Sequence, residues 1–167
     1  MRRVLITAAV AAVLAGGTAV SSATTTTPTS FSVTATVLAT CNAATAATLA
    51  FPNYTPGGGN QFGSTLVNVY CTNGTPFHVS LNAGGTGSMT NRIMLSGTNT
   101  LLYNLWTDGG YGTVFGDGTN SSATVAGSGA GIGTAVQVKV WGQLLDSLNL
   151  AAAPGSYTDS VQVTVIY

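Results

Sequence analysis

The chain has 167 residues, of which 45% are hydrophobic and only 5% are charged, and its formal net charge is zero. It contains no Glu and one His, so it lacks the side chains on which most metal sites and acid–base enzymes depend. The scarcity of Glu, Lys and Arg excludes coiled coils and argues against nucleic-acid binding, and the Thr-, Gly- and Val-rich remainder favours one all-β domain.

The first 23 residues have the layout of a secretory signal peptide. Arg2 and Arg3 form a short positive region, an apolar stretch follows over residues 4–20, and residues 21–23 (Ser-Ser-Ala) are small enough for a signal peptidase. A membrane anchor is the alternative, but the stretch is shorter than the roughly 20 residues of a span and is diluted by Ala, Gly and Thr. We therefore expect residues 1–23 to be removed and the remaining chain to be exported.

A Thr-rich segment follows, and it leads into an alternating strand pattern. Residues 24–30 have no apolar periodicity, so we expect them to be flexible or extended. Between residues 31 and 37, apolar side chains alternate with Ser and Thr, which indicates a β-strand. The apolar positions of this pattern are Phe31, Val33, Ala35 and Val37.

Further strand patterns recur along the chain, separated by Gly- or Asn-rich turns. The best helical candidate, residues 42–49, is Ala-rich but interrupted by Thr and lacks a capping pattern. Many short strands with turns between them favour a sandwich or a barrel. We expect these strands near residues 49–54 (broken by Pro52), 66–72, 77–81, 93–95, 101–106, 111–115, 136–140 and 161–167.

The Asn73-Gly74 pair looks like a two-residue hairpin turn, but the flanking pattern argues against a hairpin. In that register Val69 would face His78, so the two apolar sets would fall on opposite faces of one sheet. Either the loop has an odd number of residues, or the two strands belong to different sheets with both apolar faces inward. We favour the second arrangement, which is how immunoglobulin-like sandwiches pass from their second strand to their third.

The two cysteines, Cys41 and Cys71, are expected to form a structural disulfide. An exported chain reaches an oxidising compartment, and two cysteines allow one intramolecular connectivity. A redox pair or a metal site is the alternative. The chain has no C-x-x-C motif, and no His or acidic residue lies close in sequence to either cysteine, so we favour the structural reading.

No group of residues in the sequence marks a catalytic, metal or cofactor site. His78 alternates with Phe77 and Val79, so it is expected to point away from the core, and no partner completes a triad with it. The four Asp residues stand in turn contexts, and a calcium site built from Asp117 and Asn120 lacks sufficient ligands. We therefore expect neither an enzyme nor a bound cofactor, and nothing marks a carbohydrate site.

Several short stretches together resemble the spore coat protein U domain family, which includes subunits of archaic chaperone–usher pili. Their order and spacing agree over essentially the whole chain after residue 23, although Trp106 and Trp141 stand where the resemblance predicts Tyr or Phe. The matching stretches are residues 31–37 with Cys41, 49–54, 69–77, 92–94, 102–106, 116–118, 140–142 and 154–159.

The resemblance implies an all-β, immunoglobulin-like sandwich that lacks its final strand and carries an N-terminal donor strand. On this interpretation residues 1–23 are the signal peptide, 24–38 the extension with the donor strand, and 39–167 the incomplete domain. The donor strand of one subunit, with Phe31, Val33, Ala35 and Val37, would fill the acceptor groove of the next. That groove, which also docks a chaperone, would be bordered by Val161, Val163, Val165 and Tyr167.

The function that this resemblance implies is that of a structural subunit of an extracellular pilus, supporting adhesion and biofilm formation. Its partners would be identical or related pilin subunits, a periplasmic chaperone and an outer-membrane usher, with no nucleic acid. The chain would cross the periplasm and end in a fibre or on the cell or spore surface. Two alternatives remain: a spore or cell-surface coat protein of the same fold, and a carbohydrate-binding adhesin domain.

Overall fold

The computed structural model describes residues 23–44 and 47–167, and strands dominate it. The chain divides into a part that ends at Ala35 and a compact unit from Thr36 to Tyr167, each of which is described by itself. The expected signal peptide lies outside the described residues except for Ala23. Within the described ranges, no helix is long and apolar enough to cross a membrane.

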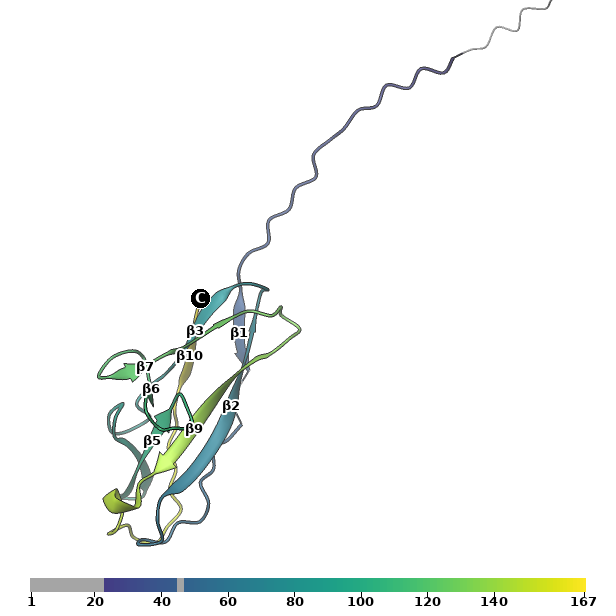
Figure 1. Ribbon diagram of the computed structural model, residues 1–167. Coiled ribbons are helices and arrows are strands. Elements are labelled where there is room, and N and C mark those ends of the chain that lie inside the picture. The colour runs from purple at the N-terminus through teal and green to yellow at the C-terminus, as the bar shows by residue number, and fades with distance from the viewer. Residues whose placement is uncertain (1–22, 45–46) are drawn as a thin grey trace, which may run out of the picture. The chain divides into compact units, whose positions relative to one another are not determined.

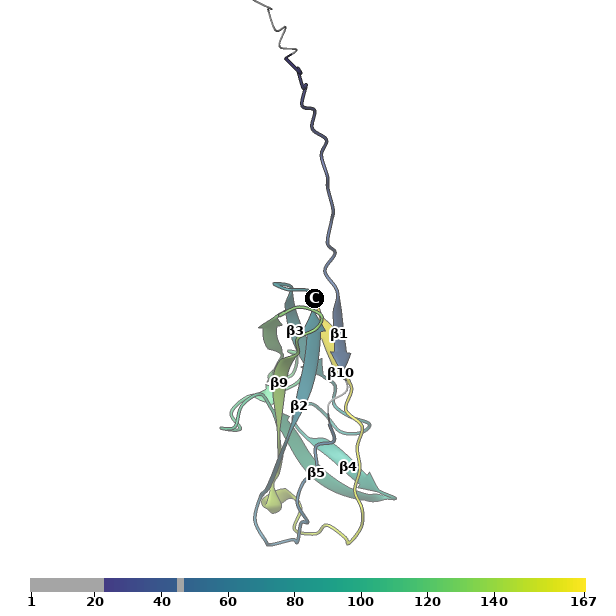
Figure 2. The ribbon, with the colours of Figure 1, turned by 90° about the vertical axis from the view of Figure 1, so that its right-hand side faces the viewer.

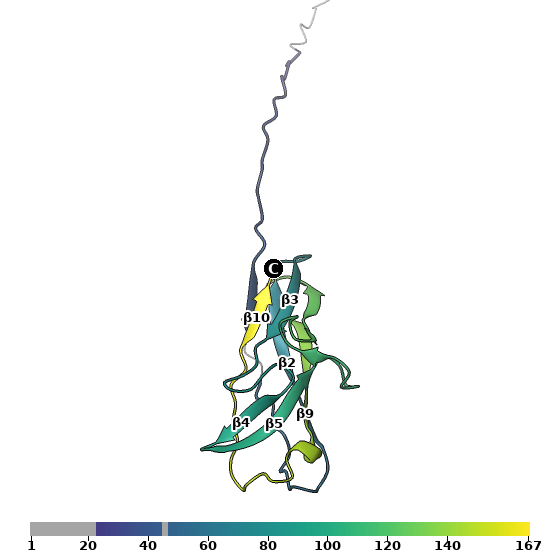
Figure 3. The same cartoon turned by 90° about the vertical axis from the view of Figure 1, so that its left-hand side faces the viewer.

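The compact unit contains two β-sheets, which Figures 1 and 3 show from two sides. All strand pairs are antiparallel except β6 and β7, and a short 3-10 helix, η1 (Asp146–Leu148), follows β9. The larger sheet has the order β1 (Cys41–Ala44), β2 (Gln61–Cys71), β9 (Val136–Leu144), β5 (Asn99–Trp106), β6 (Val114–Phe115) and β7 (Ser122–Ala123), with β4 (Arg92–Ser96) also paired to β5. The smaller sheet has the order β10 (Val163–Ile166), β3 (Pro76–Leu81) and β8 (Val125–Ser128).

The hydrophobic core lies between the two sheets and follows the period-two pattern of the sequence. Alternate residues of β2, β9 and β5 are buried against alternate residues of β3. Full burial of each Val, Leu or Phe side chain contributes about 1.5–3 kcal/mol. The central members of this core are Val67, Val69, Phe77, Val79, Leu81, Tyr103, Leu105, Val138 and Val140.

The strand pairing confirms the expectation that β2 and β3 belong to different sheets, and a tight turn joins them. The Thr75 amide donates to the Thr72 carbonyl (3.0 Å), which closes a four-residue turn, and Gly74 has a φ of 77°. A positive φ at the third position alone is the pattern of a type II turn, which does not match the strand twist of a two-residue hairpin. Both apolar faces therefore point inward.

Two expected strands are absent from the structure. The Ala-rich stretch 42–49, the best helical candidate but one without a capping pattern, has strand β1 over 42–44 and no helical structure over 47–49. Residues 31–37 are not assigned to a strand, because a strand needs a partner and the described chain pairs none with them. Residues 49–54 also lack strand pairing, whereas the short strands β7 and β8 were not expected.

A buried arginine joins the two sheets. Arg92, on β4, is 0% exposed, and its guanidinium donates to the carbonyl oxygens of Asn82 (2.9 and 3.1 Å) and Phe115 (2.7 Å). It also donates to Asn104 Oδ1 (2.9 Å) and to the Met89 carbonyl (3.1 Å). Burial lowers the pKa of Arg92, and the charges of Asp159 and Asp117 oppose part of that shift.

The predicted disulfide between Cys41 and Cys71 is present and joins β1 to β2 at directly paired positions. Next to it, the Thr72 amide donates to the Thr40 carbonyl (2.9 Å), and the Thr40 amide donates to Thr72 Oγ1 (2.9 Å). The chain is therefore fixed to the end of β2 just before the compact unit begins its first strand. Figures 2 and 3 show that β1 also lies beside β10.

Removal of the disulfide is expected to lower the free energy of unfolding by about 3–4 kcal/mol, because the bond closes a loop with a sequence separation of 30. Urea denaturation of a Cys41→Ser/Cys71→Ser variant measures this loss. Reduction of the wild-type protein serves as the control and should give the same change. A variant as stable as the oxidised wild-type chain would contradict the expectation.

Candidate functional site: a groove beside the last strand

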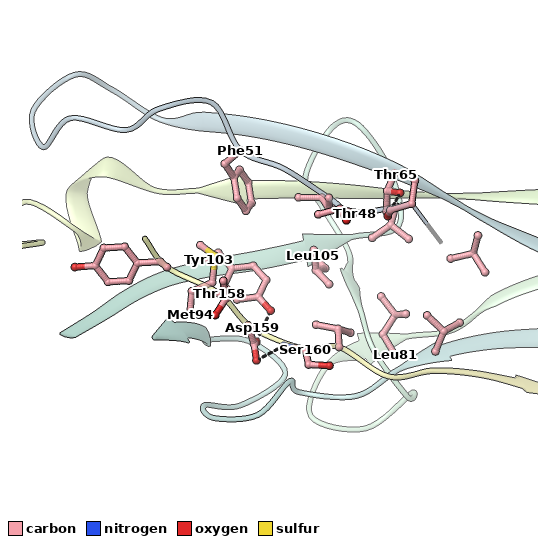
Figure 4. Close-up of a pocket in the computed structure, with 17 residues that line it drawn as sticks. Thr48, Phe51, Thr65, Leu81, Met94, Tyr103, Leu105, Thr158, Asp159 and Ser160 are labelled. Carbon is pink, nitrogen blue, oxygen red and sulfur yellow. Dashed lines mark hydrogen bonds between the residues drawn. The ribbon is translucent and has the colours of Figure 1, made fainter. Parts of the chain in front are cut away.

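A groove with a volume of about 450 Å³ opens at the side of the sandwich between two chain segments. Its floor is the inner face of both sheets, with Val67, Leu81, Tyr103, Leu105 and Val140. Figure 4 shows Thr48 and Phe51 on one side, residues 158–160 on the other, and Tyr103 and Leu105 between them. The groove therefore reaches the hydrophobic core from outside.

The first wall of the groove is the segment 47–51. It lies close to the larger sheet because two glycines, Gly63 of β2 and Gly142 of β9, face each other across the strands. A Cβ on Gly142 would lie 2.8 Å from the Leu49 side chain, and one on Gly63 would lie 2.8 Å from the Ala50 carbonyl. The paired glycines thus leave the space that Leu49 and its neighbours fill.

The second wall is the segment 157–163, which runs past β4 before it becomes β10. Leu95 and Thr158 exchange two backbone hydrogen bonds, of 2.9 and 3.0 Å, which hold this wall against β4. Beyond them, Asp159 accepts hydrogen bonds from the Tyr103 hydroxyl (2.5 Å) and from the Gly85 amide (2.8 Å). These hydrogen bonds therefore hold the second wall against β4, against Tyr103 on the groove floor and against the loop at Gly85.

The contact between Tyr103 and Asp159 brings a carboxylate to a groove whose other polar lining residues include Thr48, Thr65, Thr158 and Ser160. Burial, and then the hydrogen bond to Asp159, raise the pKa of Tyr103 far above its ordinary value. The phenol consequently stays protonated and acts as a donor at physiological pH. The hydrogen bond from Tyr103 to Asp159 holds the second wall over the groove floor.

One edge of β10 has no strand paired to it among the described residues. β10 pairs with β3 along its other edge, and Gln162 directs its backbone groups there, since its carbonyl accepts from the Asn82 amide (3.1 Å) and its amide donates to Asn82 Oδ1 (2.8 Å). Hydrogen-bonding direction alternates along an antiparallel strand. The N–H and C=O groups of Val161, Val163 and Val165 therefore point to the unpaired edge.

A second cavity, of about 640 Å³, continues the groove beyond the first one. The two cavities share Thr48, Leu49, Phe51, Met94 and Tyr157, and the second extends along residues 52–56 and 152–156. The shared residues include members of both walls, so the first and second walls border both cavities. Together the two cavities form a channel between the two walls.

The outer end of this channel depends on Asp146, which holds the loop that carries Tyr54. The Asp146 carboxylate accepts from the Tyr54 hydroxyl (2.6 Å) and the Gly57 amide (2.9 Å), and these bonds lower the pKa of Asp146 below its ordinary value of 3.8. Burial, and then the bond to Asp146, raise the pKa of Tyr54 to about 12. The loop is therefore tied to η1 through a charged acceptor.

We expect acid to release this loop. Because the folded pKa of Asp146 lies below 3.8, the tie is fully present above that pH and is lost as the pH falls through the folded pKa. Amide hydrogen exchange at Gly57 should rise in that window after correction for intrinsic rates. A Tyr54→Phe variant should move the Asp146 pKa up toward 3.8 in an NMR titration, and an unmoved pKa would show that the tie does not act on Asp146.

The N-terminal segment with the alternating pattern is extended and presents its apolar side chains to solvent. Phe31, Val33 and Val37 are 85%, 83% and 81% exposed, and Ala35 is exposed as well. Isolated exposed apolar residues are ordinary, but four at period two form one continuous apolar face. This segment therefore has the pattern of a β-strand without a sheet.

The residues expected at the acceptor groove divide into two groups. Val161 and Val163 line the groove, and Val165 packs against the core on the same strand face. Tyr167 is 61% exposed and does not line either cavity. The sequence did not predict that Tyr103 and Asp159 belong to the groove, because they are 56 residues apart and only the fold brings them into contact.

The side chains considered for other chemistry remain apart. His78 is exposed, as expected, and its nearest polar partner is Thr124 Oγ1 at 3.4 Å. Asp117 accepts hydrogen bonds from the amide and hydroxyl of Thr119, which is a local turn arrangement. No cluster of metal-ligating side chains occurs in residues 23–44 and 47–167.

Comparisons with known proteins agree with this architecture. The Spore Coat Protein U domain profile matches residues 11–164, whereas no curated protein matches the sequence. Among solved structures, the chain is similar to one in the CsuC–CsuE chaperone–tip adhesion subunit pre-assembly complex from the archaic chaperone–usher Csu pili of Acinetobacter baumannii. The similarity has a TM-score of 0.55 and 23% identity, and it covers 79% of this chain but only 41% of that one. It shows an immunoglobulin-like pilin fold.

Proposed function

Because the chain belongs to the Spore Coat Protein U domain family, we propose that it is a structural subunit of an extracellular pilus assembled by the chaperone–usher route. In this proposal residues 1–23 are the signal peptide and 24–38 carry a donor strand. Residues 39–167 form the incomplete domain, which receives the donor strand of a second copy or a related subunit. The chain would pass through the periplasm before it enters the fibre.

The observation that carries the proposal is the complementarity of two features of the same chain. The domain has an apolar groove bordered by the unpaired edge of β10, and the N-terminal segment is an exposed strand pattern with one apolar face. A strand laid along β10 would satisfy the backbone groups of Val161, Val163 and Val165. The joint between two copies would run head to tail, which gives an open-ended fibre.

The energetics favour such a joint. Burial of Phe31, Val33 and Val37 contributes about 1.5–3 kcal/mol each, and each backbone hydrogen bond adds about 0.5–1.5 kcal/mol. The inserted strand also completes the acceptor's core, so its departure requires the acceptor to open. Because the acceptor must partly unfold before the strand can leave, the joint is expected to be kinetically stable and therefore long-lived.

An unfilled groove creates the need for further partners. An unpaired strand edge above an apolar cavity is an aggregation site until it is covered. We infer that a periplasmic chaperone covers it with a strand of its own, docked along Val161, Val163 and Val165 with Tyr167 at the end, and that an outer-membrane usher exchanges that strand for the donor. The similarity to a subunit crystallised with its chaperone supports this inference.

Adhesion and biofilm formation are the roles that such a fibre would serve on a cell surface. The description of the family favours one further candidate, a coat protein of a spore or cell surface with the same fold. Chaperone and usher genes beside this gene would support the pilus, whereas expression timed to sporulation would support the coat. Electron microscopy of cells with and without the gene decides whether fibres depend on it.

Deletion of residues 24–37 tests the proposed joint directly. We expect the truncated chain to fold and bind the chaperone but to form no polymer, because it keeps the groove and lacks the donor. The measurement is whether each chain runs as an SDS-resistant ladder that collapses on boiling, and we expect that ladder for the full chain only. Fibres formed by the truncated chain would overturn donor-strand exchange, whereas failure to bind the chaperone would point to a damaged domain.

A further inference from the structure

The outer face of the larger sheet carries a cluster of aromatic side chains that the groove does not use. Phe62 is 46% exposed on β2, and its ring centroid lies 5.0 Å from that of Tyr111. Tyr111 in turn makes an edge contact with Trp106 of β5, with centroids 6.3 Å apart. Trp141, which pairs with Trp106 across the strands, carries the Lys139 ammonium 3.7 Å above its ring.

The loop that follows β5 holds Tyr111 in this cluster. The Thr107 amide donates to the Thr113 carbonyl (3.0 Å), and the Asp108 side chain and carbonyl accept from the amides of Gly110 (2.8 Å) and Tyr111 (3.3 Å). Tyr111 has a φ of 56°, a left-handed conformation that costs free energy for a residue with a side chain. The hydrogen bonds of the loop therefore hold Tyr111 in a strained backbone conformation, in which its ring lies beside those of Phe62 and Trp106.

A small cavity of about 110 Å³ adjoins the cluster at Trp106, and its lining includes no charged residue. The side-chain amides of Asn91, which is exposed, and Gln143, which is partly buried, also line it and can exchange hydrogen bonds with water or with a ligand. The indole Nε1 of Trp106 is buried and has no partner within the described chain. Leu148 lines the same cavity and is 51% exposed, so this side of the cavity faces solvent.

We propose that this cluster and cavity bind a neutral carbohydrate. The C–H face of a sugar ring packs on aromatic rings, while its hydroxyls both donate to and accept from amide side chains. An apolar protein surface would leave Asn91, Gln143 and the Trp106 N–H without partners, and such unpaired groups disfavour binding. The cavity itself is lined by uncharged residues, and the Lys139 ammonium lies outside it, over Trp141.

The carbohydrate site lies on the other side of the larger sheet from the acceptor groove. Its aromatic cluster is on the outer face of β2, β9 and β5, the groove is lined by their inner face, and the small cavity and the groove have Tyr103 in common. Donor-strand insertion would therefore leave it open, and a polymer would repeat it along its length. Multiple weak sites on one fibre increase the overall strength of attachment.

Tryptophan fluorescence tests the proposal, because both tryptophans of the chain, Trp106 and Trp141, belong to the cluster. The purified full chain is titrated with cello-, chito-, malto- and mannohexaose. We expect a saturable change in emission with at least one of them, and about tenfold weaker binding in a Phe62→Ala variant. A Gln143→Ala variant should weaken binding as well.

Ile132→Ala is the matched control, since Ile132 is a similarly exposed apolar residue (52%) and takes no part in the cluster or the cavity. Its affinity should equal that of the unaltered chain, and circular dichroism should show all variants folded. The proposal is overturned if no hexaose gives a saturable change, or if the control loses as much affinity as Phe62→Ala. An emission change that follows protein concentration alone would also overturn it and would identify the cluster as a contact between copies.

Discussion

Replacement of Arg92 by Met is expected to lower the free energy of unfolding by about 3–5 kcal/mol. The substitution leaves the carbonyl oxygens of Asn82 and Phe115 without their donor, and both accept from a side chain that is fully buried. Asn82 also aligns Gln162 at the start of β10, so the groove edge should loosen together with the core. Urea denaturation measures the stability, and hydrogen exchange of the β10 amides measures the edge.

Lys139→Met is the matched control for that variant. Lys139 is the other basic residue after the first three, and its ammonium lies over the exposed side of Trp141 rather than in the core. Its replacement should change stability by less than about 1 kcal/mol. If Arg92→Met proved as mild as the control, the buried hydrogen bonds of the guanidinium would not be what joins the two sheets.

The second large effect is expected from an acidic residue in the proposed donor strand. Val33→Asp would bring a carboxylate against the apolar floor of the groove, and burial of an unpaired charge costs several kcal/mol. We expect polymer to be lost, as judged by the SDS-resistant ladder and by electron microscopy. The domain itself should keep its stability, since Val33 is exposed and lies outside the compact unit.

Thr34→Asp adds the same charge one residue further on and provides the control. In a strand, Thr34 points to the face opposite Val33, so its carboxylate would remain in solvent when the donor is inserted. Polymer should therefore form nearly as in the unaltered chain. Equal loss in both variants would show that charge anywhere in the tail blocks assembly, and normal polymer in Val33→Asp would exclude this face from the joint.

The sequence predicted the features of the fold that depend on neighbouring residues. Alternation along residues 66–72, 77–81 and 136–140 identified the buried faces of β2, β3 and β9. A hairpin at Asn73-Gly74 would have put the apolar side chains of β2 and β3 on opposite faces of one sheet. Because only one face of such a sheet packs on the core, the pattern predicted that the two strands belong to different sheets. These conclusions need no knowledge of distant contacts.

The features that escaped prediction depend on residues far apart in the chain. In the sequence, neither Gly63 nor Gly142 indicates a packing role by itself. Their role appears only in the structure, where the strand register pairs them beneath Leu49. Arg92 has the local character of a surface residue, yet carbonyls from remote segments make its burial favourable. The aromatic cluster likewise forms only once β2, β5 and β9 lie side by side.

The attachment of the first strand also determines how a fibre of such subunits would carry a pulling force. Only three residues, Leu38 to Thr40, separate the apolar tail from Cys41, and they span at most about 11 Å. Tension from the neighbouring subunit would enter the domain at Cys41 and pass through a covalent bond into β2, a long interior strand of the larger sheet. Without that bond, the load would peel the four-residue β1 from the sheet one hydrogen bond at a time.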